Sequence, residues 1–405
     1  MTTTKRAQTP SLDYWIHDAD QHYYEPDDCY SRHIEERFKK KTMWIDRSNP
    51  DTPGRMYIGD ERCQFFSVGA GDNIGPPGMM KAFLQGSTEE GGSPSLNPIN
   101  GLSVPEFVDA KARLARMDEQ RVESSLMLPT TGVGIEPQLR ASKHREALYP
   151  SVRAFNRWLE EDWGYGQDGR IFGAPMLTLV DLDEAVAELE RLIKAGARFL
   201  VLTTGPVDGR APGDPYFDPF WSRVEEAGLN IVFHIGNTPF GEIYSKPWGL
   251  RPAPPSHRHS LMEYFLAFTE RPVMDTVVSL IADNLFGRFP KLRVLSIEYG
   301  SGWVAPMLGK LEKLARLYSK DMWRFGAPPM SPTETFRQNV WVAPFYEDDV
   351  IGLVETIGAS QVLNGSDYPH PEGLAEPIEF AQELAGLDDD SVQRVMRQNF
   401  AALIA

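Results

Sequence analysis

The residues of this 405-residue chain best suited to chemistry follow short apolar segments at four widely separated places. They are the pair Asp20 and His22, then His234, then Glu298, and finally Asp367 with His370. Several adjoin runs such as IVF or VLSI, where an unpaired charge is costly to bury. Imidazole and carboxylate groups gathered at one place are ligands for zinc, manganese or iron. These residue types predict a divalent-metal site, provided that the fold brings them together.

Eight short β-prone segments recur along the chain, mostly separated by segments with helical periodicity. Their apolar residues run almost continuously, which is typical of strands buried on both faces of a parallel sheet. The expected strands are 16–22, 124–130, 171–178, 198–203, 230–235, 293–299, 340–345 and 362–367. This alternation favours a (β/α)8 TIM barrel over a doubly wound sheet. Active sites of such barrels lie at the carboxyl ends of the strands, where the residues above are found.

The clearest helical pattern covers 182–196, where apolar residues recur every three or four positions. Asp181 is its expected N-cap and Gly196 its expected end. The other expected helices are 104–121, 148–163, 216–228, 261–289, 303–319, 348–358, 374–384 and 390–404. The chain has no G-x-G-x-x-G after its first strand, no P-loop and no G-x-S-x-G. It is therefore not expected to bind nucleotides through those loops or to use a serine nucleophile elbow.

One stretch, 25–103, interrupts the alternation with a sequence that is rich in Gly, Pro and Asp. It lies between the first strand and the first helix of a single barrel domain spanning 1–405, so we expect an insertion in a βα loop. We interpret 25–103 as a lid or dimerisation segment, with a partly disordered loop as the alternative. A homodimer or higher homo-oligomer is expected, and a hetero-oligomer is left open.

The composition excludes several classes of protein. A net charge of −16 argues against binding to nucleic acid or to an anionic membrane. No apolar run approaches the roughly 20 residues that span a bilayer, and the amino-terminal sequence lacks the apolar segment of a signal peptide. Cys29 and Cys63 do not have the spacing of a cysteine zinc site. We expect a cytoplasmic protein that acts on a small molecule.

Four sequence motifs, in this order, resemble the amidohydrolase-related family of the metal-dependent amidohydrolase superfamily, in the branch that includes aminocarboxymuconate-semialdehyde decarboxylase. The motifs are Asp20-x-His22-x-x-Glu25-Pro26, His234, Glu298-x-Gly-x-Gly-Trp303 and Ser366-Asp-Tyr-Pro-His370-x-Glu-Gly373. The resemblance implies a (β/α)8 barrel with a divalent metal at its mouth. It implies as metal ligands Asp20, His22, His234 and Asp367.

Three features depart from that family. The first ligand pair is Asp-x-His, where many members have His-x-His or Glu-x-His. Glu298 stands where the decarboxylases carry a histidine, and 200–205 lacks the lysine that bridges two metals in many relatives. Zinc is the expected metal, with manganese or iron as alternatives. Glu25, Glu298 and His370 are then further ligands or acid–base groups.

The expected reaction is hydrolysis of a small carboxylate-bearing or aromatic substrate by metal-activated water, with Asp367, Glu298 and His370 as catalytic groups. Non-oxidative decarboxylation of an aromatic or unsaturated acid is the alternative. Further alternatives are a dinuclear non-haem iron hydroxylase, in which Glu298 bridges the metals with Glu25 or His370, and a non-catalytic subunit.

Residues in the predicted mouth loops are candidates for binding the substrate. A substrate carboxylate needs a basic partner. The candidates are Arg47, Arg55, Arg62, Arg251 and Arg258. Aromatic residues near the motifs would suit a flat substrate, although core packing is the alternative for several. These aromatic residues are Tyr23, Tyr24, Trp248, Tyr299, Trp303 and Tyr368.

Overall fold

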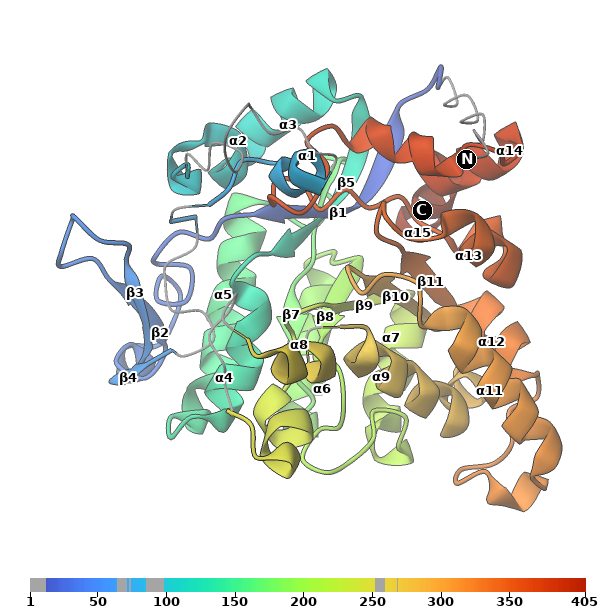
Figure 1. Ribbon diagram of the computed structural model, residues 1–405. Helices are drawn as coiled ribbons and strands as arrows, with labels where there is room; N and C mark the ends of the chain where they lie inside the picture. Colours follow the sequence, from blue (N-terminus) through green and yellow to red (C-terminus); the bar gives the residue numbers. More distant parts are fainter. Residues whose placement is uncertain (1–11, 64–70, 73, 85–97, 252–258, 268) are drawn as a thin grey trace.

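Parallel strands occupy the centre of the molecule, and helices surround them (Figure 1). The computed structural model describes residues 12–63, 71–72, 74–84, 98–251, 259–267 and 269–405. The central strands are β1 (Ile16–Tyr23), β5 (Val122–Pro129), β6 (Ile171–Gly173), β7 (Met176–Leu177), β8 (Phe199–Leu202), β9 (Asn230–His234), β10 (Arg293–Ile297) and β11 (Val340–Ala343). They form two parallel sheets, in the orders β1-β5-β6 and β11-β10-β9-β8-β7.

The two sheets are joined at both sides into one ring. β6 and β7 are the two halves of one segment, and they pair with β5 and β8 respectively. On the other side, 362–368 lies between β11 and β1. Leu363 N donates to Val342 O at 2.9 Å, and Ala19 N donates to Asn364 O at 2.8 Å. The chain therefore forms the predicted (β/α)8 barrel.

The eighth predicted strand, 362–367, makes only isolated bridges to its neighbours. Asp367 has a left-handed backbone with φ of 58°, which ends the extended conformation. A Cβ on Gly365 would lie only 3.0 Å from the Asp20 Cβ, so the segment passes close to β1. This part of the ring is consequently a tight turn that carries functional residues.

The helices outside the barrel largely follow the sequence pattern. Their bounds are α2 (Pro105–Val108), α3 (Ala110–Glu119), α4 (Ile135–Ala141), α5 (Leu148–Asp162), α6 (Leu182–Lys194), α7 (Asp218–Ala227), α9 (Arg271–Ala282), α11 (Val304–Leu317), α12 (Pro332–Asn339) and α13 (Val350–Ile357). Asp181 accepts from Glu184 N at 3.1 Å, which confirms the predicted N-cap of α6. The residues of β1, β8 and β9 are buried throughout, as expected for strands covered on both faces.

Some predicted helices are divided. The single helix predicted over 261–289 is wrong: α8 (Leu261–Ala267), α9 and α10 (Leu285–Arg288) replace it. Pro272 begins a new helix at α9, and Asn284, with φ of 55°, separates α9 from α10. Near the carboxyl terminus, Pro377–Leu384 is a 3₁₀ helix, and a π-helical turn separates α14 (Asp389–Gln393) from α15 (Asn399–Ile404).

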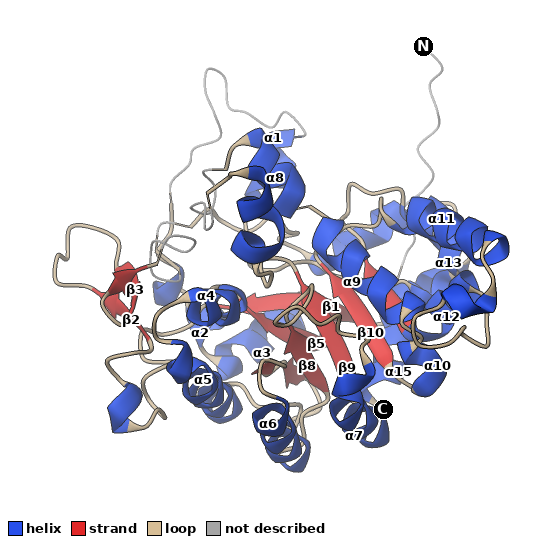
Figure 2. Cartoon of the chain, turned by 90° about the horizontal axis from the view of Figure 1, so that it is seen from below, coloured by secondary structure: helices blue, strands red, loops and turns tan. Residues whose placement is uncertain are grey.

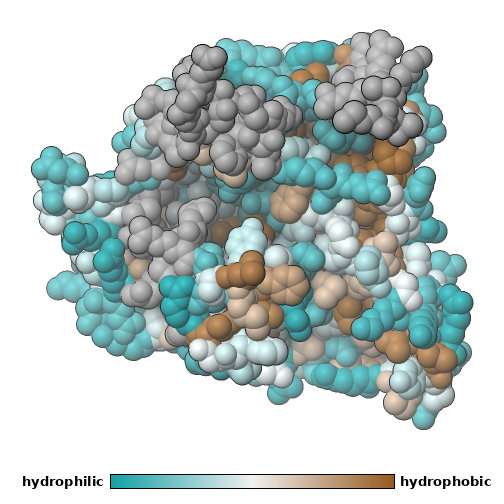
Figure 3. All heavy atoms as spheres, viewed as in Figure 1, coloured by the Kyte–Doolittle hydropathy of each residue, from teal (hydrophilic) through white to brown (hydrophobic). Residues whose placement is uncertain are grey.

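The described part of the predicted insertion contains an antiparallel sheet and a short helix. These elements are β2 (Met43–Asp46), β3 (Arg55–Ile58), β4 (Glu61–Arg62) and α1 (Met79–Leu84). Figure 2 shows α1 and α8 on the same side of the central strands. Leu261, Tyr264 and Phe265 of α8 are exposed. The face seen in Figure 3 is mostly hydrophilic, with scattered hydrophobic areas. A role for 25–103 as a lid or dimer contact stays a prediction, as does a single domain over 1–405.

Among the residues that the structure describes, no helix is long and apolar enough to span a bilayer. The helices lie instead around the outside of the barrel, with their apolar faces against the strands.

The closure of the ring can be tested at Gly373, which packs against the turn of the eighth segment. A Cβ there would lie 2.4 Å from Ser366 O and 2.7 Å from Asp367 O, both of which are backbone atoms. Gly373→Ala is expected to lower the free energy of unfolding by about 1–3 kcal/mol, because the backbone must move. Gly309→Ala in α11 is the control, since nothing lies within 4 Å of its added methyl group. Equal urea midpoints for Gly373→Ala and the parent protein would contradict this close approach.

Candidate metal centre

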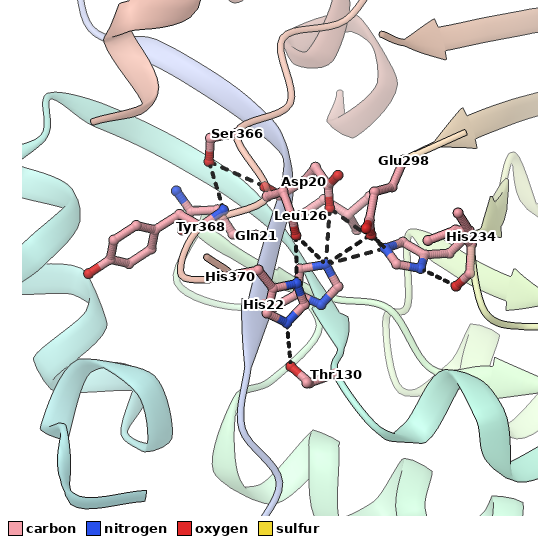
Figure 4. Close-up of polar contacts among 12 residues, drawn as sticks. Asp20, Gln21, His22, Leu126, Thr130, His234, Glu298, Ser366, Tyr368 and His370 are labelled. Carbon is pink, nitrogen blue, oxygen red and sulfur yellow. Dashed lines mark hydrogen bonds and ion pairs between the residues drawn. The ribbon is translucent and has the colours of Figure 1, made fainter. Parts of the chain in front are cut away.

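Side chains from four strand ends meet at one end of the barrel (Figure 4). Asp20 and His22 lie on β1, His234 ends β9, Glu298 directly follows β10, and Asp367 lies in the eighth segment. Two groups have all their ligand atoms within 4.8 Å of one another: Asp20, His22, His234 and Glu298 form one, and His22, Glu298, Asp367 and His370 form the other. The structure thus brings together six of the seven predicted ligand candidates. Glu298 and His22 belong to both groups, so Glu298 lies nearer the centre of the candidate site than the sequence indicated.

The two imidazoles at the centre present their Nε2 atoms to each other. His22 Nδ1 lies 3.2 Å from Pro129 O, and His234 Nδ1 lies 2.8 Å from Ile235 O. A carbonyl oxygen only accepts, so each Nδ1 carries the hydrogen. The two Nε2 atoms, 3.2 Å apart, therefore face each other with their lone pairs. Only a proton or a cation between them relieves this repulsion.

Three carboxyl groups surround the same point. Asp20 Oδ1 lies 3.2 Å from His22 Nε2, Asp367 Oδ1 lies 3.4 Å from the same atom, and Glu298 Oε2 lies 3.0 Å from His234 Nε2. Burial raises the pKa of Glu298, and burial together with the Glu298 carboxylate raises that of Asp367. Carboxylates this close in a buried space are stabilised either by shared protons or by a cation among them.

The donor set fits a divalent cation. Groups bound about 2.1 Å from one ion lie about 3 Å apart, which matches the spacing of these nitrogens and oxygens. Burial lowers the pKa of His22 to about 3, so its Nε2 lone pair is free at neutral pH. Asp20 Oδ1 is buried and has no hydrogen-bond donor among the described residues. An orphaned carboxylate oxygen beside two imidazole lone pairs is what a bound cation satisfies.

The backbone is bent to bring these groups together. The pairing of β1 with β5 shifts register between Asp18 and Gln21, and this irregularity lies at Asp20. Glu298 and Asp367 both have positive φ, 59° and 58°, which is unfavourable for residues with side chains. Each costs on the order of 1–3 kcal/mol and persists only where the surroundings impose it. The site therefore depends on local strain that the fold supports.

His370 and Asp367 together hold a proton. His370 Nε2 lies 3.1 Å from Thr130 Oγ1, whose own hydrogen is donated to Tyr23 O at 2.7 Å. Thr130 must then accept a hydrogen from His370 Nε2. His370 Nδ1 lies 2.7 Å from Asp367 Oδ1, and a hydrogen bond there needs a second proton on one of the two groups. This pair is a proton store at the edge of the metal centre.

Glu25, a further predicted ligand candidate, lies outside both groups. Its carboxylate accepts from Thr131 N at 3.1 Å, from Thr131 Oγ1 at 3.0 Å and from Gly132 N at 2.8 Å. Both oxygens are thereby engaged in holding the turn that follows β5. Glu25 thus supports the mouth of the barrel without facing the other candidates.

Two of the candidate arginines have carboxylate partners elsewhere. Arg47 pairs with Asp27 and Asp72, and Arg251 pairs with Glu263. Arg55 and Arg62 lie on the small antiparallel sheet, and Arg258 lies outside the described residues.

The structure adds Arg140 of α4, which the sequence reasoning missed. Its side chain is 1% exposed and lies between loops that follow β5, β8 and β9, near Pro206 O and Glu242. Its Nη1 forms an ion pair with the buried Glu136 at 3.5 Å, and its Nη2 forms one with Glu242 at 3.1 Å. Arg140 is thus a buried arginine that, like Arg47 and Arg251, is already paired with carboxylates.

Most of the candidate aromatic residues are part of the packing. Tyr23 stacks near Trp163, and Tyr24 packs against Phe107. Tyr299 donates its hydroxyl to His234 O at 3.1 Å and so orients a member of the metal centre. Trp303 and Tyr368 are buried, whereas Trp248 is 63% exposed.

The chain matches the protein-family model described as Amidohydrolase over residues 98–404. It belongs to the amidohydrolase family. An amidohydrolase of known structure from Mycobacterium avium subsp. paratuberculosis K-10 shares 36% identity with it, at a TM-score of 0.86, over 98% of this chain and 99% of that one. These matches confirm the predicted family and fold, and make this chain an enzyme of the amidohydrolase superfamily.

More distant relatives of this amidohydrolase are named as decarboxylases. The 2,6-dihydroxybenzoate decarboxylase from Rhizobium has 20% identity and a TM-score of 0.55, over 72% of this chain and 87% of that one. A dihydroxybenzoic acid decarboxylase from Polaromonas sp. JS666, solved with bound manganese, has 18% identity and a TM-score of 0.56, over 82% of this chain and 97% of that one. The 2-amino-3-carboxymuconate-6-semialdehyde decarboxylase of Dictyostelium discoideum is 21% identical over 57% of this chain, and the match spans only 60% of its length.

The metal centre can be tested by removing its two central ligands. His22→Ala with His234→Ala is expected to cut the metal content of the purified amidohydrolase to less than about a tenth, since two of roughly four ligands are lost. The fold should remain by circular dichroism. His33→Ala with His144→Ala is the control, because these histidines pair with surface carboxylates and belong to neither group. Unchanged metal content in the first variant would show that the site lies elsewhere.

Metal binding is also expected to depend on pH. Burial opposes a charge on His234, but Glu298 and Asp20 beside it raise the pKa of its imidazole well above 6.5. The metal-free amidohydrolase thus keeps His234 protonated at pH 7, whereas a ligand nitrogen must be unprotonated. Binding should release about one proton, and affinity should fall as the pH falls. Calorimetry with Mn²⁺ in buffers of different ionisation enthalpy measures this release, and affinity independent of pH would contradict it.

Proposed function

We propose that this amidohydrolase is a metal-dependent, non-oxidative decarboxylase of an aromatic or unsaturated carboxylic acid. The observation that carries the proposal is the 2.7 Å contact between Asp367 Oδ1 and His370 Nδ1 beside the metal-ligand groups, a contact that requires a shared proton. Decarboxylation requires a proton to be delivered to carbon, and a stored proton at this place suits that step. The decarboxylase names of the distant relatives support the same reaction class.

In the proposed reaction, a substrate carboxylate and one proton become CO₂ and a C–H bond. The bond between the substrate carbon and its carboxyl group breaks, its electron pair stays on the carbon, and Asp367 delivers the proton there from Oδ1. Solvent then restores the proton to the Asp367–His370 pair, where His370 Nδ1 is again its hydrogen-bond partner. A bound divalent cation supplies the positive charge that holds the substrate carboxylate and a neighbouring oxygen.

We propose a single manganese ion as the cofactor. Carboxylate oxygens favour manganese, and three carboxyl groups accompany the two imidazoles here. Glu25 is engaged by Thr131 and Gly132, and both nitrogens of His370 already have partners. These contacts favour one cation over the dinuclear arrangement of a hydroxylase. The substrate is a small molecule in this proposal, and homo-oligomeric assembly remains a prediction.

The proposal is tested by measuring CO₂ release from a panel of hydroxybenzoates and unsaturated acids with the manganese-loaded enzyme. Deuterium from D₂O should enter the product at the carbon that loses CO₂. Asp367→Asn is expected to lower kcat by about 10²–10⁴-fold at saturating Mn²⁺, the range for loss of a general acid. Glu355→Gln, which changes an exposed carboxylate on α13, is the control. Hydrolysis of esters or amides without CO₂ release would instead establish the hydrolase alternative.

A further inference from the structure

One fully buried carboxylate next to the metal centre belongs to neither ligand group. Asp18 accepts four hydrogen bonds. Its Oδ1 receives Ser366 N at 3.0 Å and Asp20 N at 3.2 Å, and its Oδ2 receives Ser366 Oγ at 2.6 Å and Gln21 Nε2 at 2.9 Å. Asp18 therefore fastens the irregular part of β1 to the turn of the eighth segment.

The two elements that Asp18 joins carry separate members of the metal centre. Asp20 follows it by two residues on β1, and Asp367 follows its partner Ser366. Asp367 N also donates to Asp20 O at 2.8 Å, so the two segments are held together at the residue after Ser366 as well. Backbone bonds also join these segments, with Ala19 N donating to Asn364 O at 2.8 Å and His22 N donating to Tyr368 O at 2.7 Å. Between them, the Asp18 carboxylate fixes Ser366 through both its amide and its hydroxyl, and so contributes to the position of Asp367 relative to His22.

The side-chain amide of Gln21 connects Asp18 to a positively charged side chain, that of Arg113. Arg113 is fully buried, and its Nη1 donates to Gln21 Oε1 at 3.2 Å, while Gln21 Nε2 donates to Asp18. A guanidinium only donates and a carboxylate only accepts, so the Gln21 amide has one workable orientation. Arg113 Nη2 also donates to His22 O at 2.7 Å, which holds the backbone of a second ligand candidate.

We infer that Asp18, supported by Gln21 and Arg113, is a positioning residue that sets the cation affinity of the metal centre. The inference rests on the metal centre of the proposed function. Asp18 acts through the two segments that it joins, β1 and the turn at Ser366, without contact with the cation or substrate. Removing its charge should therefore alter the ligand geometry before it alters the fold.

The test is Asp18→Asn in the full chain, compared with the parent protein and with Asp283→Asn. An asparagine keeps the size of the side chain but places an NH₂ group against donors that an aspartate accepts. Loss of such an outer partner typically reduces metal affinity about 10–100-fold, and we expect a loss of that size for Mn²⁺ by equilibrium dialysis. The absorption bands of Co²⁺ bound in place of Mn²⁺ should shift. Asp283 is also buried but belongs to neither group, and its variant should bind like the parent.

Each outcome decides the inference. Mn²⁺ affinity of Asp18→Asn within about threefold of the parent, with an unchanged Co²⁺ spectrum, would overturn it, since the expected loss is tenfold or more. If Asp18→Asn does not fold, Ser366→Ala replaces it: the Ser366 N donor to Asp18 stays, while the Oγ that donates to Asp18 and accepts from Tyr368 N is lost. Weaker Mn²⁺ binding by that variant supports the inference, and unchanged binding overturns it. A parent protein that binds Mn²⁺ but releases no CO₂ refutes the proposed function alone, since affinity is measured without turnover.

Discussion

Three carboxyl groups and two imidazoles share one buried space in this protein, and the need for positive charge among them is the constraint on which the rest depends. The groups come from strands far apart in the sequence, and only a closed parallel barrel brings their carboxyl ends to one point. Hydrophobic burial stabilises the barrel, but it does not offset the repulsion among the crowded charges. A cation does so when bound, and shared protons do so in its absence.

The backbone around the site is strained, and identifiable contacts hold it. Glu298 and Asp367 both adopt left-handed conformations at strand ends. Ser301 N donates to Asp348 Oδ2 at 2.7 Å in the turn after Glu298, while Gly373 packs against the backbone of the Asp367 turn. Asp18 adds a buried carboxylate that joins this turn to β1. Such strain is typical of sites where geometry matters more than local stability.

The three further ligand or acid–base candidates of the sequence prediction have different surroundings in the structure. Glu25, Glu298 and His370 were equivalent in the sequence, as charged residues beside recognised motifs. In the structure Glu25 accepts backbone hydrogens, Glu298 contacts His234, and His370 shares a proton with Asp367. Thr130 decides the last of these, since its hydroxyl is already committed to Tyr23 O and orients the His370 ring. Sequence patterns cannot show such differences, because each depends on partners from another strand.

The barrel and the strand ends that carry the ligand candidates could be predicted from the sequence, because burial on both faces and helical periodicity are local patterns. Pro272 is also a sequence signal for the start of a new helix, although the apolar pattern around it resembles one continuous helix. Which atoms face one another became known from the folded chain. His22 is oriented by a carbonyl 107 residues away, and Asp18 binds Ser366 348 residues away. These contacts depend on register and chain closure, which no local segment encodes alone.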